Sequence, residues 1–190
     1  MKDKPIFYDT DCIVSFLIIG DVFVLHKLFS KAIIPRPVYD ELTHESTPSV
    51  IKNNLNILIK NNFIEIKEID IRSKLYTTYK CIEDGFWGNK PIGKGEASAI
   101  AFAIENSGIV ASNNLSDVKE LTEKHNIPLL TTAIILSFAV DNNIIDESKA
   151  DTMWLKMIKR NIKLPTDSFL DYYLHKYKID CKNFDIYNYL

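Results

Sequence analysis

The chain has 190 residues, of which 46% are hydrophobic and 25% are charged, and its formal net charge is −2. This composition is typical of one globular domain with a buried core and excludes a disordered chain. The charge excludes a protein that coats nucleic acid through overall positive charge, although single lysines can still contact phosphate. The cysteines form no CxxC pair, so neither a disulfide framework nor a zinc ribbon is supported.

Apolar segments along the chain are short. The longest runs from Cys12 to Gly20 and is interrupted by Ser15, whereas a membrane-spanning helix needs roughly 20 apolar residues. The first residues lead into a strand-like segment and lack the small-residue cleavage site of a secretory signal. We therefore expect a cytoplasmic protein that does not enter a membrane.

Short apolar segments alternate with segments of helical periodicity. The first expected strand, residues 5–8, ends at Asp9-Thr10-Asp11, which can cap a helix that begins near Cys12, and Asp21 can cap a helix over 22–29. The further expected strands are 32–34, 63–66, 108–111 and 128–130. The further expected helices are 37–42, 49–60, 70–80, 96–105, 115–125, 132–142, 147–161 and 167–177, with an irregular loop over 83–95. This alternation predicts an α/β fold with a mostly parallel sheet covered on both faces.

The end of the chain is rich in aromatic residues. We divide the chain into one domain over residues 1–163 and a helical extension over 164–190 that packs on it. The aromatic residues of the extension are Tyr172, Tyr173, Tyr177, Phe184, Tyr187 and Tyr189. They dock on the domain, pair two protomers or bind a partner, and the sequence does not rank these three roles.

Acidic residues follow several of the expected strands. Asp9 directly follows the first strand, Glu41 lies in the short helix after the second, and Asp117 lies just past the fourth. Glu96 opens the helix that leads into the fourth strand. In open α/β sheets the reactive groups gather beyond the carboxyl ends of the strands. We therefore expect these four side chains to face one crevice.

A cluster of carboxylates needs a cation, because each pair repels by roughly 4 kcal/mol at 4 Å. The oxygen ligands, together with the absence of His or Cys at metal-ligand spacing, favour Mg²⁺ or Mn²⁺, held by Asp9, Glu96 and Asp117. A metal so held can activate water and neutralise developing charge when a phosphodiester is hydrolysed. The predicted catalytic residues are Asp9, Glu41, Glu96 and Asp117.

The order and spacing of four segments resemble those of the PIN-domain family. The segments are Ile-Phe-Tyr-Asp-Thr-Asp-Cys-Ile-Val (6–14), Pro-Arg-Pro-Val-Tyr-Asp-Glu-Leu (35–42), Gly-Lys-Gly-Glu-Ala-Ser-Ala-Ile-Ala-Phe-Ala (93–103) and Ile-Val-Ala-Ser-Asn-Asn-Leu-Ser-Asp (109–117). The resemblance implies a PIN-like three-layer fold with a five-stranded parallel sheet in the order 3-2-1-4-5, dependence on Mg²⁺ or Mn²⁺, and endoribonuclease activity. Many bacterial members are VapC-like toxins, so the resemblance also implies an antitoxin protein as partner. We further expect an RNA substrate and a homodimer.

The family's fourth acidic position has two alignments in this chain. The first three positions correspond to Asp9, Glu41 and Glu96. One branch of the family ends the fourth strand with two aspartates, where this chain has Asn113 and Asn114. Another branch carries Thr/Ser-x-Asn-x-x-Asp, which residues 112–117 fit, and we favour this alignment, with Asp117 as the acid and Asn114 as a neutral orienting group. Under the first alignment the site has lost negative charge and binds metal poorly or not at all.

Other residues near these acids receive supporting roles. They are Thr10, Asp11, Ser112, Asn113 and Asn114, each of which can instead serve only the local backbone. Lys94 is a candidate contact to a substrate phosphate or a solvated loop lysine. The basic run Lys156, Lys159, Arg160 and Lys163 is interpreted as a solvated helix face rather than an RNA track. The histidines form no spaced pair and receive no catalytic role.

Two other functions fit the sequence. Asp9-Thr10-Asp11 after a strand resembles the nucleophile motif of haloacid-dehalogenase-type phosphatases, but these enzymes need a later acidic pair, where this chain has Asn113-Asn114. The other alternative is a PIN-like scaffold that has lost its chemistry and binds RNA or a protein partner. A titration with Mg²⁺ or Mn²⁺ separates the scaffold from the enzyme.

Overall fold

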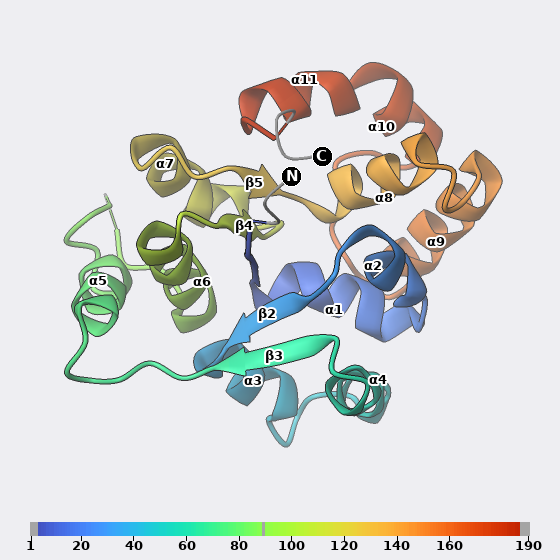
Figure 1. Ribbon diagram of the computed structural model, residues 1–190. Coiled ribbons are helices and arrows are strands. Elements are labelled where there is room, and N and C mark those ends of the chain that lie inside the picture. The colour runs from blue at the N-terminus through green and yellow to red at the C-terminus, as the bar shows by residue number, and fades with distance from the viewer. Residues whose placement is uncertain (1–3, 89, 187–190) are drawn as a thin grey trace.

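A five-stranded parallel sheet forms the centre of the protein (Figure 1). The computed structural model describes residues 4–88 and 90–186. The strands are β1 (Ile6–Tyr8), β2 (Ala32–Pro35), β3 (Ile64–Lys67), β4 (Ile109–Ala111) and β5 (Leu129–Leu130). Their order across the sheet is β3-β2-β1-β4-β5, which confirms the expected α/β fold class and strand order.

The central strand β1 is paired on both edges. Phe7 lies opposite Ile33 of β2 and opposite Val110 of β4, and both pairings are parallel. Every residue of β1, β2 and β4 is buried, as expected for parallel strands covered on both faces. The strand order reverses between β1 and β4, so the crevice beyond their carboxyl ends is the expected place for a ligand site.

Helices cover the sheet and connect its strands. They are α1 (Thr10–Ile19), α2 (Phe23–Leu28), α3 (Arg36–Thr43), α4 (Ser49–Lys60), α5 (Lys74–Glu83), α6 (Lys94–Asn106), α7 (Leu115–Lys124), α8 (Thr132–Asp141), α9 (Glu147–Lys159), α10 (Phe169–His175) and α11 (Tyr177–Asn183). Within the described residues none of these helices combines the length and the apolar character that a membrane span requires.

The helices form a layer on each side of the sheet. Helix α6 packs against β1, β2 and β4, and α5 packs against α6. The rings of Phe7 in β1 and Phe102 in α6 stack with their centroids 5.3 Å apart. On the other side, α1 contacts α4 and α9, while α8 contacts α2 and α9. Figure 1 shows α5, α6 and α7 to the left of the sheet and α1, α2, α8 and α9 to its right.

Helix α5 begins later than the sequence predicts. A helix was expected over residues 70–80, but the structure has it from Lys74. The Ser73 hydroxyl accepts a hydrogen bond from the backbone N–H of Tyr76 at 3.1 Å. Ser73 is therefore the N-cap, and the residues before it form a turn.

Asp21 does not cap α2, so that prediction is wrong. The N-cap of α2 is Val22, which makes no side-chain hydrogen bond there. The Asp21 carboxylate instead accepts from the ammonium groups of Lys149 at 2.8 Å and Lys156 at 3.2 Å, both in α9. These two ion pairs link the turn between α1 and α2 to α9.

The aromatic residues of α10 and α11 dock on α8 and α9. Trp154 of α9 is fully buried, and its ring lies 5.8 Å from that of Phe169 and 5.7 Å from that of Tyr172. The Asp141 carboxylate at the end of α8 accepts hydrogen bonds from the hydroxyls of Tyr173 and Tyr177. Docking is thus the role seen for these residues. Tyr187 and Tyr189 lie outside the described residues.

The outer edge of β5 is also covered. The backbone N–H of Leu129 donates a hydrogen bond of 3.1 Å to the carbonyl oxygen of Phe184, which directly follows α11. On its other edge β5 pairs with β4. The segment after α11 therefore engages the edge of the last strand.

Candidate active site

Asp9 lies at the carboxyl end of β1 and is the N-cap of α1. Its backbone is extended, and its Oδ1 accepts a hydrogen bond of 2.6 Å from the N–H of Thr10. Its Oδ2 accepts one of 2.9 Å from the Ser112 hydroxyl, which follows β4. The residue is only 1% exposed. The Asp9 carboxylate therefore caps α1 and also lies in the crevice, and its two hydrogen bonds fix its orientation.

The segment after β4 also holds Asp11. Both carboxylate oxygens of Asp11 accept from the backbone N–H of Asn113, at 3.0 and 3.1 Å. The Ser112 hydroxyl has one proton, which serves the shorter contact to Asp9, while Asp11 Oδ1 lies 3.4 Å away. The ends of β1 and β4 are thus joined through two acids and the residues that follow β4.

Asn113 has a structural role in this segment. Its Oδ1 accepts from the N–H of Thr132 at 2.8 Å, and its Nδ2 donates to the Thr132 hydroxyl at 2.9 Å. Thr132 is the first residue of α8. The Asn113 amide therefore fastens the end of β4 to the beginning of α8.

Asn114 bridges two of the predicted acids. Its Nδ2 donates one hydrogen bond of 2.9 Å to Glu96 Oε1 and one of 2.9 Å to Asp117 Oδ2. Asp117 also forms an ion pair with Lys90, with Nζ 2.7 Å from Oδ1. The hydrogen bond from Lys90 is the main cause that lowers the pKa of Asp117. Asp117 therefore contacts the site through the Asn114 amide.

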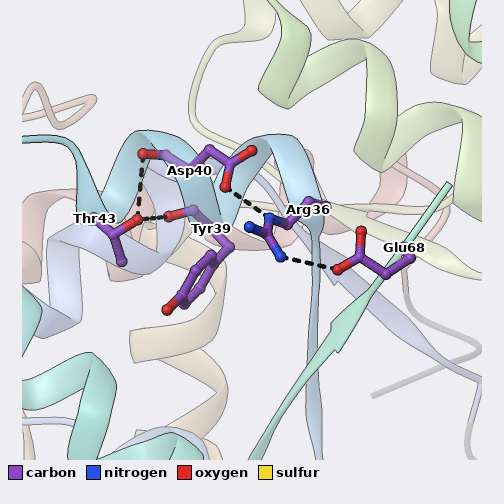
Figure 2. A network of polar contacts seen from close by, with 5 residues as sticks. All are labelled: Arg36, Tyr39, Asp40, Thr43 and Glu68. Carbon is purple, nitrogen blue, oxygen red and sulfur yellow. Dashed lines mark hydrogen bonds and ion pairs between the residues drawn. The ribbon is translucent and has the colours of Figure 1, made fainter.

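Glu41 approaches Asp9 from α3. The Thr10 hydroxyl donates a short hydrogen bond to Glu41 Oε2. Arg36, the first residue of α3, forms ion pairs with Asp40 at 2.7 Å and with Glu68, which follows β3, at 3.0 Å. Figure 2 shows both contacts. Exposed ion pairs of this kind add little stability, but the contact with Glu68 connects the helix that carries Glu41 to the neighbouring strand.

The acids line one cavity of about 540 Å³, here called the carboxylate cavity. Its lining residues come from α1, α3, α6, the segment after β4 and the segment after α9. They are Asp9, Thr10, Asp11, Val14, Glu41, Glu96, Asn113, Asn114, Asn161, Ile162 and Lys163. Three of the four predicted catalytic acids, Asp9, Glu41 and Glu96, therefore line this cavity. Asp117 is not among its lining residues and is hydrogen-bonded to Asn114, which is.

Gly95 allows α6 to approach the acids. A Cβ atom at this position would lie 2.8 Å from Asp9 Oδ1 and 3.2 Å from both Glu41 Oε2 and the Thr10 hydroxyl oxygen. Ordinary contacts of a Cβ atom begin at 3.4 Å. Because Gly95 has no side chain, the oxygens of Asp9, Glu41 and Thr10 can lie close to the backbone of α6.

The buried acids oppose one another's ionisation. Burial raises the pKa of Asp9 well above its ordinary value, and the charges of Asp11 and Glu96 raise it further. Burial also raises the pKa of Asp11, to which the charge of Glu96 contributes. A cation near these oxygens would remove this penalty, because an opposite charge favours the ionised form.

The donor set fits a hard divalent cation in its chemistry. Asp9 and Glu41 direct oxygens at the same point beside Gly95, and Glu96 follows one residue later on α6. Among residues 4–88 and 90–186, no group of three or more His, Cys, Asp or Glu side chains already surrounds one point. Glu41, which is exposed, and Glu96, which is half-buried, would have to turn toward Asp9 to complete the ligands.

The structure adds residues that the sequence reasoning missed. Gly95 carries a partial signal, because it stands in the Gly-x-Gly-Glu segment next to Glu96. The sequence gives no such signal for Lys90 and Lys163, because the fold, and not a sequence motif, places them near the acids. Lys94, the predicted phosphate contact, lines a neighbouring cavity together with Glu41.

The sequence profile of the family described as the PIN domain matches residues 5–174. The chain belongs to the PIN-domain family, as the four sequence segments indicate. PIN domains are generally nucleases and typically bind divalent metals. No curated protein matches the sequence.

Proposed function

We propose that this PIN-domain protein is a Mg²⁺- or Mn²⁺-dependent endoribonuclease that hydrolyses RNA phosphodiester bonds in the carboxylate cavity. One observation carries the proposal: Asp9, Glu41 and Glu96, from three separate elements, line one cavity, and the pKa of Asp9, the buried acid among them, is raised. Such an arrangement stores repulsion that a divalent cation relieves.

The residues divide the work as follows. Asp9, Glu41 and Glu96 would hold the metal, with Asp117 able to act through Asn114. When bound, the metal supplies a water of lowered pKa and neutralises charge on the phosphate. Ser112 and the N–H of Thr10 keep the Asp9 carboxylate in one orientation, and the Thr10 hydroxyl does the same for Glu41.

The test is incubation of total RNA with the purified protein and Mn²⁺, beside the Asp9→Asn variant. The wild-type protein is expected to cleave RNA, and the variant is expected to lose this activity. Asp171→Asn, which changes an exposed acid of α10 outside the cavity, is the matched control and should cleave like wild type. Equal cleavage by the wild-type protein and Asp9→Asn would remove the catalytic proposal.

A PIN-like scaffold that binds RNA or a protein is the second candidate. The observation that favours it is the position of Asp117, which is paired with Lys90 outside the carboxylate cavity. The absence of any stabilisation by Mg²⁺ or Mn²⁺ in thermal unfolding would favour the scaffold.

The proposal extends to partners. We further propose that the protein is a toxin that an antitoxin protein inhibits. We also propose that it acts as a homodimer in the cytoplasm. Inspection of the neighbouring reading frame for a small DNA-binding protein tests the antitoxin. Light scattering of the purified protein tests the dimer.

A further inference from the structure

A second cavity adjoins the carboxylate cavity. It has a volume of about 580 Å³ and is lined by Pro37, Asp40, Glu41, His44, Ser46, Thr47, Tyr79 and Lys94. Glu41 lines both cavities, so a ligand that extends past Glu41 passes from one into the other. Volumes of about 300–1,000 Å³ are ordinary for ligand sites.

The polar groups of the second cavity suit one nucleotide. Lys94, the first residue of α6, is exposed and engages no ion pair with another described residue. Asp40 is paired with Arg36, so part of the cavity's negative charge is already neutralised. His44 is also exposed, and the Ser46 hydroxyl lies 2.8 Å from its Nδ1. The cavity thus offers an ammonium group for a phosphate and an imidazole ring for a base.

A second lysine lines the carboxylate cavity itself. Lys163, in the segment after α9, lines the carboxylate cavity, is exposed, and has no ion pair within the described part of the chain. Each of the two adjoining cavities therefore has one lysine in its lining, Lys94 in the second cavity and Lys163 in the carboxylate cavity. A chain with a phosphate on each side of the cleaved bond matches this order of charges.

We propose that the second cavity binds the nucleotide that neighbours the cleaved bond of a single-stranded RNA, a site that rests on the proposed function. Lys94 contacts its phosphate, His44 stacks on its base, and Lys163 contacts the phosphate on the other side of the cleaved bond, within the carboxylate cavity. Single-stranded RNA is the fitting form, because its bases are free to stack on aromatic or imidazole rings.

The test measures binding separately from cleavage. A short fluorescein-labelled single-stranded RNA of mixed sequence is titrated with the Asp9→Asn protein in Mg²⁺, over a series of salt concentrations. Lys94→Ala and Lys163→Ala are each expected to lower the slope of log affinity against log salt by about 0.7, the value for one lost phosphate contact. His44→Ala is expected to weaken binding about tenfold with the slope unchanged, as for one lost base stack.

Lys60→Ala is the matched control. Lys60 is exposed and ends α4 before β3, so it lies toward the amino ends of the strands, away from both cavities. It should leave affinity and slope unchanged. Wild-type slopes in both lysine variants, wild-type affinity in His44→Ala, or no RNA binding at all would overturn the second site. Absence of cleavage by the wild-type protein, with these binding effects intact, would overturn the catalytic proposal alone.

Discussion

Replacing Gly95 by alanine tests the geometry of the site with the addition of one methyl group. The new Cβ would lie 2.8 Å from Asp9 Oδ1, where ordinary contacts begin at 3.4 Å. The Asp9 carboxylate cannot simply turn aside, because Ser112 and the N–H of Thr10 hold its two oxygens. Either α6 or the carboxylate must therefore move by a fraction of an ångström.

The expected stability change is small because two effects oppose each other. Alanine is favoured over glycine in a helix by up to about 1 kcal/mol, whereas overpacking costs about 1–3 kcal/mol. We expect a net loss of about 1 kcal/mol, which lowers Tm by about 2–4 °C in a chain of this size. The functional effect should be larger, since a displacement near 1 Å can cost about 10²-fold in rate.

The assay combines thermal unfolding, with and without Mn²⁺, and RNA cleavage. Gly88→Ala is the matched control, because the three atoms nearest to a Cβ there belong to the Leu121 side chain and lie at an ordinary 3.7–3.8 Å. Gly95→Ala should fold, lose most of its stabilisation by Mn²⁺ and cleave RNA about 10²-fold more slowly, while Gly88→Ala behaves like wild type. Equal Mn²⁺ response and cleavage in the two variants would refute the role assigned to Gly95.

Four further outcomes are expected. Mn²⁺ at a hundredfold excess over its Kd should raise the free energy of unfolding by about 2.7 kcal/mol and Tm by about 5–11 °C, and Asp9→Asn should abolish the shift. Because the pKa of Asp9 is raised on folding, Asp9 contributes stability that is fully present below about pH 4 and is lost as pH rises through the raised pKa, so the difference in the free energy of urea unfolding between the metal-free wild-type protein and Asp9→Asn should change over that pH range. Asn113→Ala should lower the free energy of unfolding by about 1–3 kcal/mol in urea, since its two bonds to Thr132 are lost; an unchanged midpoint would contradict its structural role. Asn114→Asp adds a carboxylate to the cluster, so calorimetry should show lower stability without metal and a larger Mn²⁺ shift than wild type.

The sequence predicts the sheet well because its strands are short, apolar and buried on both faces. The acids Asp9, Glu41 and Glu96 are predictable for a related reason: each occupies a strand end or a helix start in a fold whose strand ends meet. Asp9 combines a cap and a site position, and both follow from its place after β1.

Contacts between distant side chains are the part that the sequence does not predict. Asp117 occupies the predicted position, yet its pairing with Lys90 depends on how the loop before α6 folds over α7. Asp21 has the residue type of a helix cap, but two lysines of α9 compete for its oxygens. In the sequence, Lys163 is one of several lysines interpreted as solvated. In the structure, the segment after α9 places it in the lining of the carboxylate cavity.

The hydrogen bond between Leu129 and Phe184 bears on self-association. An open strand edge is a template on which a second chain can add a strand. At β5 the N–H of Leu129 is already taken by the carbonyl oxygen of Phe184, so growth of the sheet into a neighbouring copy is disfavoured there. Removal of the segment that begins with α11 would uncover this edge, so we expect the shortened protein to self-associate through β5.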